Sequence, residues 1–146
     1  MNPEKLKKYN EFADALDMLD EESRFEYIID IGKAQDDTPF PAEAMTDANL
    51  MHGCMSKVWI LHDVEGDRHY FRGESDAIIV KGLVSMMTQS FSGLTREELA
   101  ELDLDYVRRL NLGSLTMQRQ VGMMAMLKHM QKLSRSEASA GARQRG

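Results

Sequence analysis

Two short β-rich segments that lie between helical patterns constrain the fold of this chain more than any other feature. Residues 57–62 (KVWILH) and 69–72 (HYFR) are rich in aromatic and β-branched side chains, and the turn-forming EGD at 65–67 separates them. This pattern predicts an antiparallel β-hairpin. Because an isolated two-stranded ribbon is only marginally stable, the hairpin needs partners, and we expect a third strand around 49–51.

Apolar residues recur at helical spacing on both sides of the hairpin. The order of two helices, two strands and further helical pieces predicts an α+β domain, in which a small antiparallel sheet of about three strands packs in two layers against helices. Residues 34–50 carry two prolines and short polar side chains without periodicity, so we expect an irregular surface segment there. The helices are expected at 3–18, from Asp20 to near Lys33, from the N-cap Ser75 to 92, at 95–102, at 105–112 and from Thr116 to about Leu133.

The length and charge of the chain narrow its class. Its 146 residues match one domain of ~100–150 residues, which we place at 1–133, and the tail 134–146 lacks bulky apolar residues and is expected to be disordered. The 18 Lys and Arg against 24 Asp and Glu leave a net charge of −6 without a basic cluster, which argues against nucleic-acid binding. No apolar run approaches the ~18–20 residues that cross a bilayer, and the charged start is unlike a signal peptide, so we expect a cytoplasmic protein without a membrane segment.

The chain has one cysteine, Cys54, which excludes an intramolecular disulfide and a CxxC redox pair. Gly53, immediately before it, permits backbone angles that let a partner approach closely. From the residues alone two interpretations stay open, a loop thiol presented to a partner and a buried structural cysteine, which is the commoner fate of free cysteines. A nucleophilic thiol needs nearby positive charge or a base to lower its pKa, and the candidates are His52, Lys57 and Arg119.

The other polar residues and the 12 methionines have ordinary structural interpretations. The four histidines lack the HxH or HxxxH spacing that sets two imidazoles on one metal ion, so no metal site is expected. By itself, Asp76 complements the positive end of a helix, and Lys81 belongs to a solvated face. The methionines of the last helix form an apolar stripe that is typical of a core.

Three motifs in this chain together resemble the SufE family of sulfur acceptors in iron–sulfur cluster assembly. They are GCMSKVWI at 53–60, GESDAIIVKGL at 73–83 and LTMQRQVGM at 115–123. They occur in the family's order, and the similarity extends over about 20–133. The resemblance implies a fold similar to that of the IscU-type scaffolds.

The resemblance also implies roles for single residues. Cys54 matches the family's acceptor cysteine, Arg119 its late arginine and Asp76 the acidic residue that opens a helix. On this basis Arg119 is expected to stabilise the thiolate or persulfide anion, and Asp76 is expected in the loop or the partner interface. Supporting positions of the same motifs are Asn49, His52, Gly53, Ser56, Trp59 and Lys81. The chain departs from the family's usual pattern at Met51, Met55 and Lys57 near the thiol and at Met117 near the start of the last helix.

The function that the resemblance implies is sulfur transfer. Cys54 is expected to accept sulfane sulfur as a persulfide from a SufS-like cysteine desulfurase, which the chain activates, and to pass it to a downstream iron–sulfur scaffold complex. Pyridoxal phosphate belongs to the desulfurase, so the chain is a sulfur-transfer partner without a cofactor of its own rather than a stand-alone enzyme. Two alternatives remain, a thiol-dependent enzyme that uses Cys54 and an interaction module with an inert cysteine. The sequence leaves open whether the chain forms a homodimer.

Overall fold

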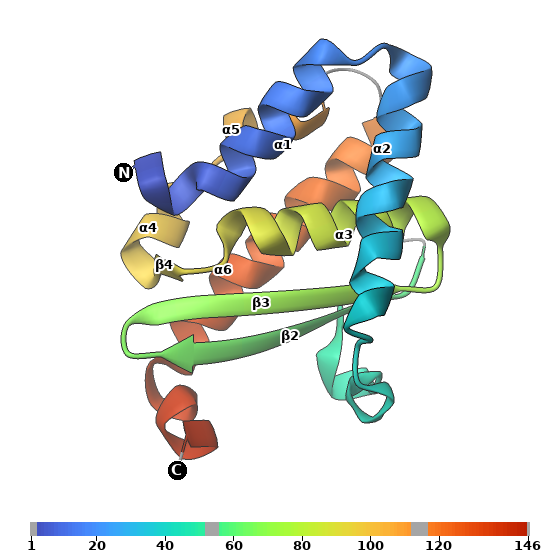
Figure 1. The fold of residues 1–146 in the computed structure, drawn as a ribbon. Helices are drawn as coiled ribbons and strands as arrows, with labels where there is room; N and C mark the ends of the chain where they lie inside the picture. The colour runs from blue at the N-terminus through green and yellow to red at the C-terminus, as the bar shows by residue number, and fades with distance from the viewer. Residues whose placement is uncertain (1–2, 52–55, 112–116, 146) are drawn as a thin grey trace.

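The computed structural model of this chain describes residues 3–51, 56–111 and 117–145, and it confirms the expected α+β class (Figure 1). Helices α1 and α2 precede the β-hairpin, and the α-helices α3 to α6 follow it, as the sequence predicts. The helical elements are η1 (Pro3–Leu6), α1 (Lys7–Met18), α2 (Glu21–Ala34), η2 (Gln35–Asp37), η3 (Ala42–Ala44), η4 (Asp47–Asn49), α3 (Ile78–Phe91), α4 (Arg96–Ala100), α5 (Leu104–Asn111) and α6 (Met117–Arg145).

The sheet is antiparallel and has four strands in the order β1-β2-β3-β4. The hairpin strands β2 (Val58–Glu65) and β3 (Arg68–Ser75) pair along their whole length, from Val58 with Ser75 to Glu65 with Arg68. Gly66 has φ of 62° at their turn, a left-handed conformation that glycine adopts without a steric penalty. The expected third strand is confirmed as β1 (Leu50–Met51), which pairs with β2.

Two details of the secondary structure differ from the prediction. A fourth strand, β4 (Leu94–Thr95), pairs with the start of β3, and its two residues are too few to produce a sequence pattern. Ser75 is also not the N-cap of the next helix, because it ends β3, where its hydroxyl donates to the carbonyl oxygen of Lys57 on the neighbouring chain segment (2.7 Å). Helix α3 begins at Ile78, and its N-cap residue Ala77 has no capping side chain.

Helix α3 forms the centre of the core. Figure 1 shows α3 alongside β3, with α2 crossing it and α1 beyond. Gly82 makes the α2–α3 crossing close, because a Cβ at this position would overlap the main-chain carbonyl of Ile28, and a Cβ on Gly32 would lie 2.9 Å from the amide nitrogen of Gly82. The expected methionine core is confirmed, since the fully buried side chains include those of Met86, Met87, Met123, Met126 and Met130.

Helix α6 is longer than the sequence predicts. It runs from Met117 to Arg145, whereas the apolar pattern predicts an end near Leu133. The side chain of Ser134 is buried at 2 % exposure and donates to the carbonyl of Gln131. The division into a domain at 1–133 and a disordered tail at 134–146 stays a prediction. Within the described residues, no helix combines the length and the apolar character needed to span a membrane.

Candidate functional site

The candidate site is centred on the connection between β1 and β2. Cys54 lies outside the described residues, together with His52, Gly53 and Met55. The positions on both sides of them are described: Met51 ends β1 and is 4 % exposed, and it pairs with Val58, the first residue of β2. The chain segment that contains Cys54 is therefore anchored at both ends to one edge region of the sheet.

Ser75 and Asp76 hold the chain immediately after this segment. The Ser75 hydroxyl donates to the Lys57 carbonyl (2.7 Å), while the Lys57 amide donates to Oδ1 of Asp76 (3.1 Å). Ser75 is buried, and its hydroxyl oxygen also accepts from the amide of Ala77 (3.3 Å). Both polar groups of the Lys57 main chain are thus bound by Ser75 and Asp76 of the motif at 73–83. Asp76 thus binds the chain just after the segment of Cys54 through this amide, a contact more specific than the helix-end interaction that its sequence position suggests.

Asn49, Ser56 and Trp59 flank the same connection. Asn49 ends η4, and its side-chain amide donates to the carbonyl of Ala44 (2.8 Å), which closes the turn before β1. Ser56 is half-buried and lies just before β2. Trp59 is half-buried in β2, where it pairs with Leu50 on one side and with Glu74 on the other. All three positions lie in the described chain on either side of Cys54, and their supporting roles stay predictions.

Lys81 does not lie on a solvated face, so the interpretation of its sequence position alone is wrong. Its ammonium group contacts Oδ1 of Asp36 at 2.5 Å and Oε2 of Glu74 at 3.5 Å, and its side chain is 21 % exposed. The hydrogen bond to Asp36 and the negative charges of Glu74 and Asp36 raise the pKa of Lys81 above its ordinary value, against the opposing effect of burial. Lys81 therefore links three parts of the chain that the sequence separates.

Arg119 lies in the first turn of α6. Its side chain is half-buried, and its Nη1 atom is shielded from solvent. Since Cys54 is outside the described residues, the expected action of Arg119 on a sulfur anion stays a prediction. The same holds for the partner-interface role of Asp76.

A histidine pair inside the hairpin was not found by sequence reasoning. Nε2 of His62 and Nδ1 of His69 are 2.7 Å apart, so one ring donates a hydrogen bond to the other. The His62 ring also stacks on Phe71, with ring centroids 4.9 Å apart. The two histidines are seven residues apart in sequence, and only the strand register, which pairs His62 with Phe71 and Val64 with His69, brings them to one face. A search for the HxH and HxxxH patterns therefore misses them.

The environment keeps this pair uncharged at neutral pH. Burial, followed by the neighbouring His69, lowers the pKa of His62 to about 4. The pKa of His69 is also lowered, first by burial and then by the positive charge of Arg96. In the part of the chain that the structure describes, no group of three or more His, Cys, Asp or Glu side chains is placed to hold a metal ion.

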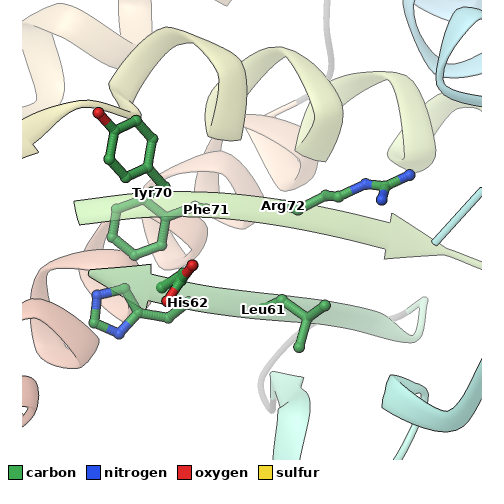
Figure 2. A pocket seen from close by; sticks show the side chains of 6 residues that line it. Leu61, His62, Tyr70, Phe71 and Arg72 are labelled. Carbon is green, nitrogen blue, oxygen red and sulfur yellow. The ribbon is translucent and has the colours of Figure 1, made fainter. Parts of the chain in front are cut away.

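A shallow cavity of about 370 Å³ lies along the middle of the β2–β3 hairpin, farther along the strands than Lys57 (Figure 2). Its lining consists of Leu61, His62, Asp63, Tyr70, Phe71 and Arg72. Figure 2 shows the Tyr70 and Arg72 side chains leaving β3 in different directions, so their polar ends do not converge on one point. The cavity does not include the residues that hold Lys57, and it is separate from the candidate site.

Comparison with known proteins matches this arrangement to one family. The family model of SufE, described as an Fe-S metabolism associated domain, matches residues 10–134. An uncharacterized SufE-like protein of Synechocystis sp. is 37% identical over 113 residues, which cover 77% of this chain and 70% of that protein. Uncharacterized SufE-like proteins of Rhizobium etli and Rhizobium meliloti are 34% and 35% identical, over 83% and 82% of this chain and 84% and 89% of their own lengths.

The fold has a solved counterpart as well. The solution structure of a hypothetical protein from Thermus thermophilus superposes with a TM-score of 0.70 and 20% sequence identity, over 88% of this chain and 94% of that one. This likeness supports the fold, while the family match covers both hairpin strands, the Lys57 contacts and helix α3. The chain therefore belongs to the SufE family, whose domain is associated with iron–sulfur metabolism.

Proposed function

We propose that this chain accepts sulfane sulfur on Cys54 from a pyridoxal-phosphate-dependent cysteine desulfurase of the SufS type and passes it on for iron–sulfur cluster assembly in the cytoplasm. The observation that carries the proposal is the family match over residues 10–134, which includes the segment with the chain's single cysteine. The anchoring of that segment by Met51, Ser75 and Asp76 supports it, because a transferring thiol needs a defined base from which it reaches a partner.

The proposed reaction is thiol exchange at a persulfide. The Cys54 thiolate attacks the terminal sulfur of a persulfide on the desulfurase, the sulfur–sulfur bond of that persulfide breaks, and the desulfurase cysteine leaves as a thiolate. A new bond joins Sγ of Cys54 to the transferred sulfur, and no net oxidation or reduction occurs. Pyridoxal phosphate is the desulfurase's cofactor, and the proposal requires none in this chain.

The chemistry fits a chain with one thiol. A second thiol close to Cys54 would attack the new persulfide, form a disulfide and release sulfide, whereas this chain holds no other cysteine. In the proposal Arg119 favours the thiolate or persulfide anion through its positive charge, and the sulfur then moves to a downstream scaffold complex.

Mass spectrometry of the intact chain tests this proposal. After incubation with a SufS-type desulfurase and free cysteine, without reductant, we expect a gain of one sulfur atom that maps to Cys54 and disappears on treatment with a thiol reductant. The Cys54→Ser variant should gain none while keeping the wild-type unfolding curve. A wild-type chain that gains no sulfur contradicts the proposal and favours the thiol enzyme or the interaction module. A Ser variant that still stimulates the desulfurase also contradicts it and favours the interaction module, because the thiol enzyme needs Cys54 as well.

A further inference from the structure

The segment 35–49, which we call the strap, connects α2 to β1 and leads directly to the segment of Cys54. It contains only the three short helices η2, η3 and η4, so its place depends on contacts with the rest of the molecule. At its end, η4 lies against β2, and the side-chain contacts that we consider lie near its beginning. The side-chain amide of Gln35 donates to the carbonyl of Gly73 (2.7 Å), Asp36 pairs with Lys81 (2.5 Å), and Phe40 is 6 % exposed with the guanidinium of Arg72 5.9 Å from its ring centre.

Lys81 completes a series of contacts that connects the two ends of the strap. Leu50, at the end of the strap, pairs with Trp59, and Trp59 pairs with Glu74 in the next strand. Glu74 contacts the ammonium group of Lys81 (3.5 Å), which in turn contacts Asp36 at the beginning of the strap. One lysine thus joins the two ends of the strap through a single row of the sheet.

The next row of the sheet contains Met51, the last described residue before the segment of Cys54. Met51 pairs with Val58, and Val58 pairs with Ser75, whose hydroxyl binds the Lys57 carbonyl. Glu74 links the two rows, because its Oε1 accepts from the Ser75 amide (2.9 Å) while its Oε2 faces Lys81. Glu74 therefore contacts both Lys81 and the row of the sheet that contains Met51 and Val58.

The helix crossing fixes where Lys81 stands. The Lys81 amide donates to the carbonyl of Ala77 (2.8 Å) in the first turn of α3, and the next residue, Gly82, packs against the main chain of Ile28 in α2. Since α2 ends at Ala34, this contact brings the Lys81 side chain to the point where the strap begins. The two neighbouring residues Lys81 and Gly82 of the motif at 73–83 therefore act together. Gly82 permits the close crossing of α2 and α3, and this crossing lets the Lys81 side chain reach Asp36.

We propose that Lys81 is a positioning residue for sulfur acceptance, because its pairing with Asp36 and Glu74 sets the position of β1 and hence of the segment that presents Cys54. This inference rests on the proposed function. The clamp formed by Lys81, Asp36 and Glu74 acts through the strap and the sheet row.

Lys81→Met tests the clamp, because it removes the charge and keeps the length of the side chain. The first measurement is amide hydrogen exchange of the full chain. We expect exchange at Leu50, Met51 and Trp59 to become about tenfold faster, while the protected amides of α3 and α6 keep their rates. Lys81→Arg, which keeps the positive charge, should restore most of the protection.

The second measurement is the rate of sulfur uptake from a desulfurase at saturating chain concentration. We expect the rate of sulfur uptake to decrease about tenfold for Lys81→Met, with a small change in the half-saturating concentration. The reason is that the variant disturbs the presentation of the thiol and leaves the docking of the two proteins intact. Lys5→Met is the matched control, since Lys5 forms a comparable ion pair with Glu98 (2.7 Å, side chains 23% and 18% exposed) between the N-terminal segment and α4. It should leave uptake and exchange at β1 unchanged.

The outcomes separate the two proposals. Unchanged exchange at β1 in Lys81→Met, or equal loss of uptake in Lys5→Met, overturns the positioning role of Lys81. If the wild-type chain takes up no sulfur, the proposed function fails, and the exchange data alone then decide whether the clamp positions β1. If Lys81→Met and Lys81→Arg are equally slow, the positive charge is not what positions the segment.

Discussion

The two ends of the β2–β3 hairpin are built differently, although the same strands form both. At the site end, Ser75 and Asp76 bind the main chain of Lys57 through its carbonyl and its amide. At the far end, His62 and His69 bind each other, and His62 stacks on Phe71. The first arrangement fixes a neighbouring chain segment, and the second satisfies buried polar atoms within the hairpin. Under the proposed function, the site end would serve the presentation of Cys54, while the far end would serve stability.

The largest loss of stability is expected for a change at Gly82, where α2 and α3 cross. Gly82→Ala places a Cβ against the main-chain carbonyl of Ile28, which cannot move without displacing α2. We expect the free energy of unfolding to fall by about 3 kcal/mol, measured by urea denaturation. Gly122→Ala is the control, because a Cβ at Gly122 meets nothing within 4 Å, and it should leave stability unchanged or raised. Equal denaturation curves for the two variants would contradict the close crossing.

The second-largest effect is expected for Ser75→Ala, which changes the site end of the hairpin and leaves the far end intact. It removes the partner of the Lys57 carbonyl and of the Ala77 amide, which are two partly buried hydrogen bonds, so we expect a loss of about 2 kcal/mol in the free energy of unfolding. Sulfur uptake should slow by about tenfold, since Lys57 adjoins the segment of Cys54.

Ser90→Ala provides the control for Ser75→Ala. Ser90 is 1 % exposed, and its hydroxyl has no hydrogen-bond partner among the described residues, so its removal should change neither stability nor uptake by much. If Ser75→Ala behaves like Ser90→Ala in both assays, the site end is not held as the geometry indicates.

The far end should respond to pH. The pKa of His62 is lowered to about 4 from an ordinary value of 6.5, and that of His69 is lowered too. The unfolded chain therefore binds more protons than the folded one between pH 6.5 and 4, and the free energy of unfolding falls as the pH falls through this range. Allowing for solvent screening of a half-buried ring, we expect a loss of about 1–2 kcal/mol.

Urea denaturation at several pH values measures this effect. A double variant, His62→Gln with His69→Gln, should lose most of the pH dependence between 6.5 and 4 while keeping the rate of sulfur uptake at neutral pH. Uptake that falls with the double variant as strongly as with Ser75→Ala would show that the two ends are not distinct in function.

The sequence could predict the long elements and the hairpin, because periodic apolar residues decide them locally. It could not assign Ser75, since a serine before a helical pattern fits both an N-cap and a strand end, and the Lys57 carbonyl, 18 residues away, decides between them. Lys81 and Asp36 are 45 residues apart, so their pairing leaves no local pattern. The two residues of β4 pair with β3 without any alternation of their own.

Part of the candidate site followed from motif resemblance, and part required the structure. The resemblance named Asp76 and Lys81 as motif positions, but their partners, the Lys57 amide and the Asp36 carboxylate, lie outside the residues' own local sequence. Tertiary contacts of this kind depend on strand register and helix spacing, which a single sequence does not encode as a local signal. The roles proposed for Cys54 and Arg119 stay predictions until sulfur uptake is measured.

The smallest effect is expected for variants of Asp76, which test the single hydrogen bond from the Lys57 amide at the site end. Asp76 is exposed, so its replacement should change the free energy of unfolding by no more than about 0.5 kcal/mol. Asp76→Ala leaves the Lys57 amide without its acceptor and should slow sulfur uptake by about threefold at saturating chain concentration. Asp76→Asn keeps an oxygen that can accept from the same amide, so it should retain nearly the wild-type rate if the hydrogen bond is what matters.

The two Asp76 variants distinguish geometry from charge. If Asp76→Asn is as slow as Asp76→Ala, the negative charge of Asp76 matters, and it acts either on the partner protein or on the end of α3. An increase in the half-saturating concentration would show that it acts on the partner protein. If Asp76→Ala equals the wild type in both rate and half-saturation, the hydrogen bond to Lys57 is not needed for presentation. Ser75 alone would then hold the site end, through the Lys57 carbonyl, and the site end of the hairpin would depend, like the far end, on a buried polar contact.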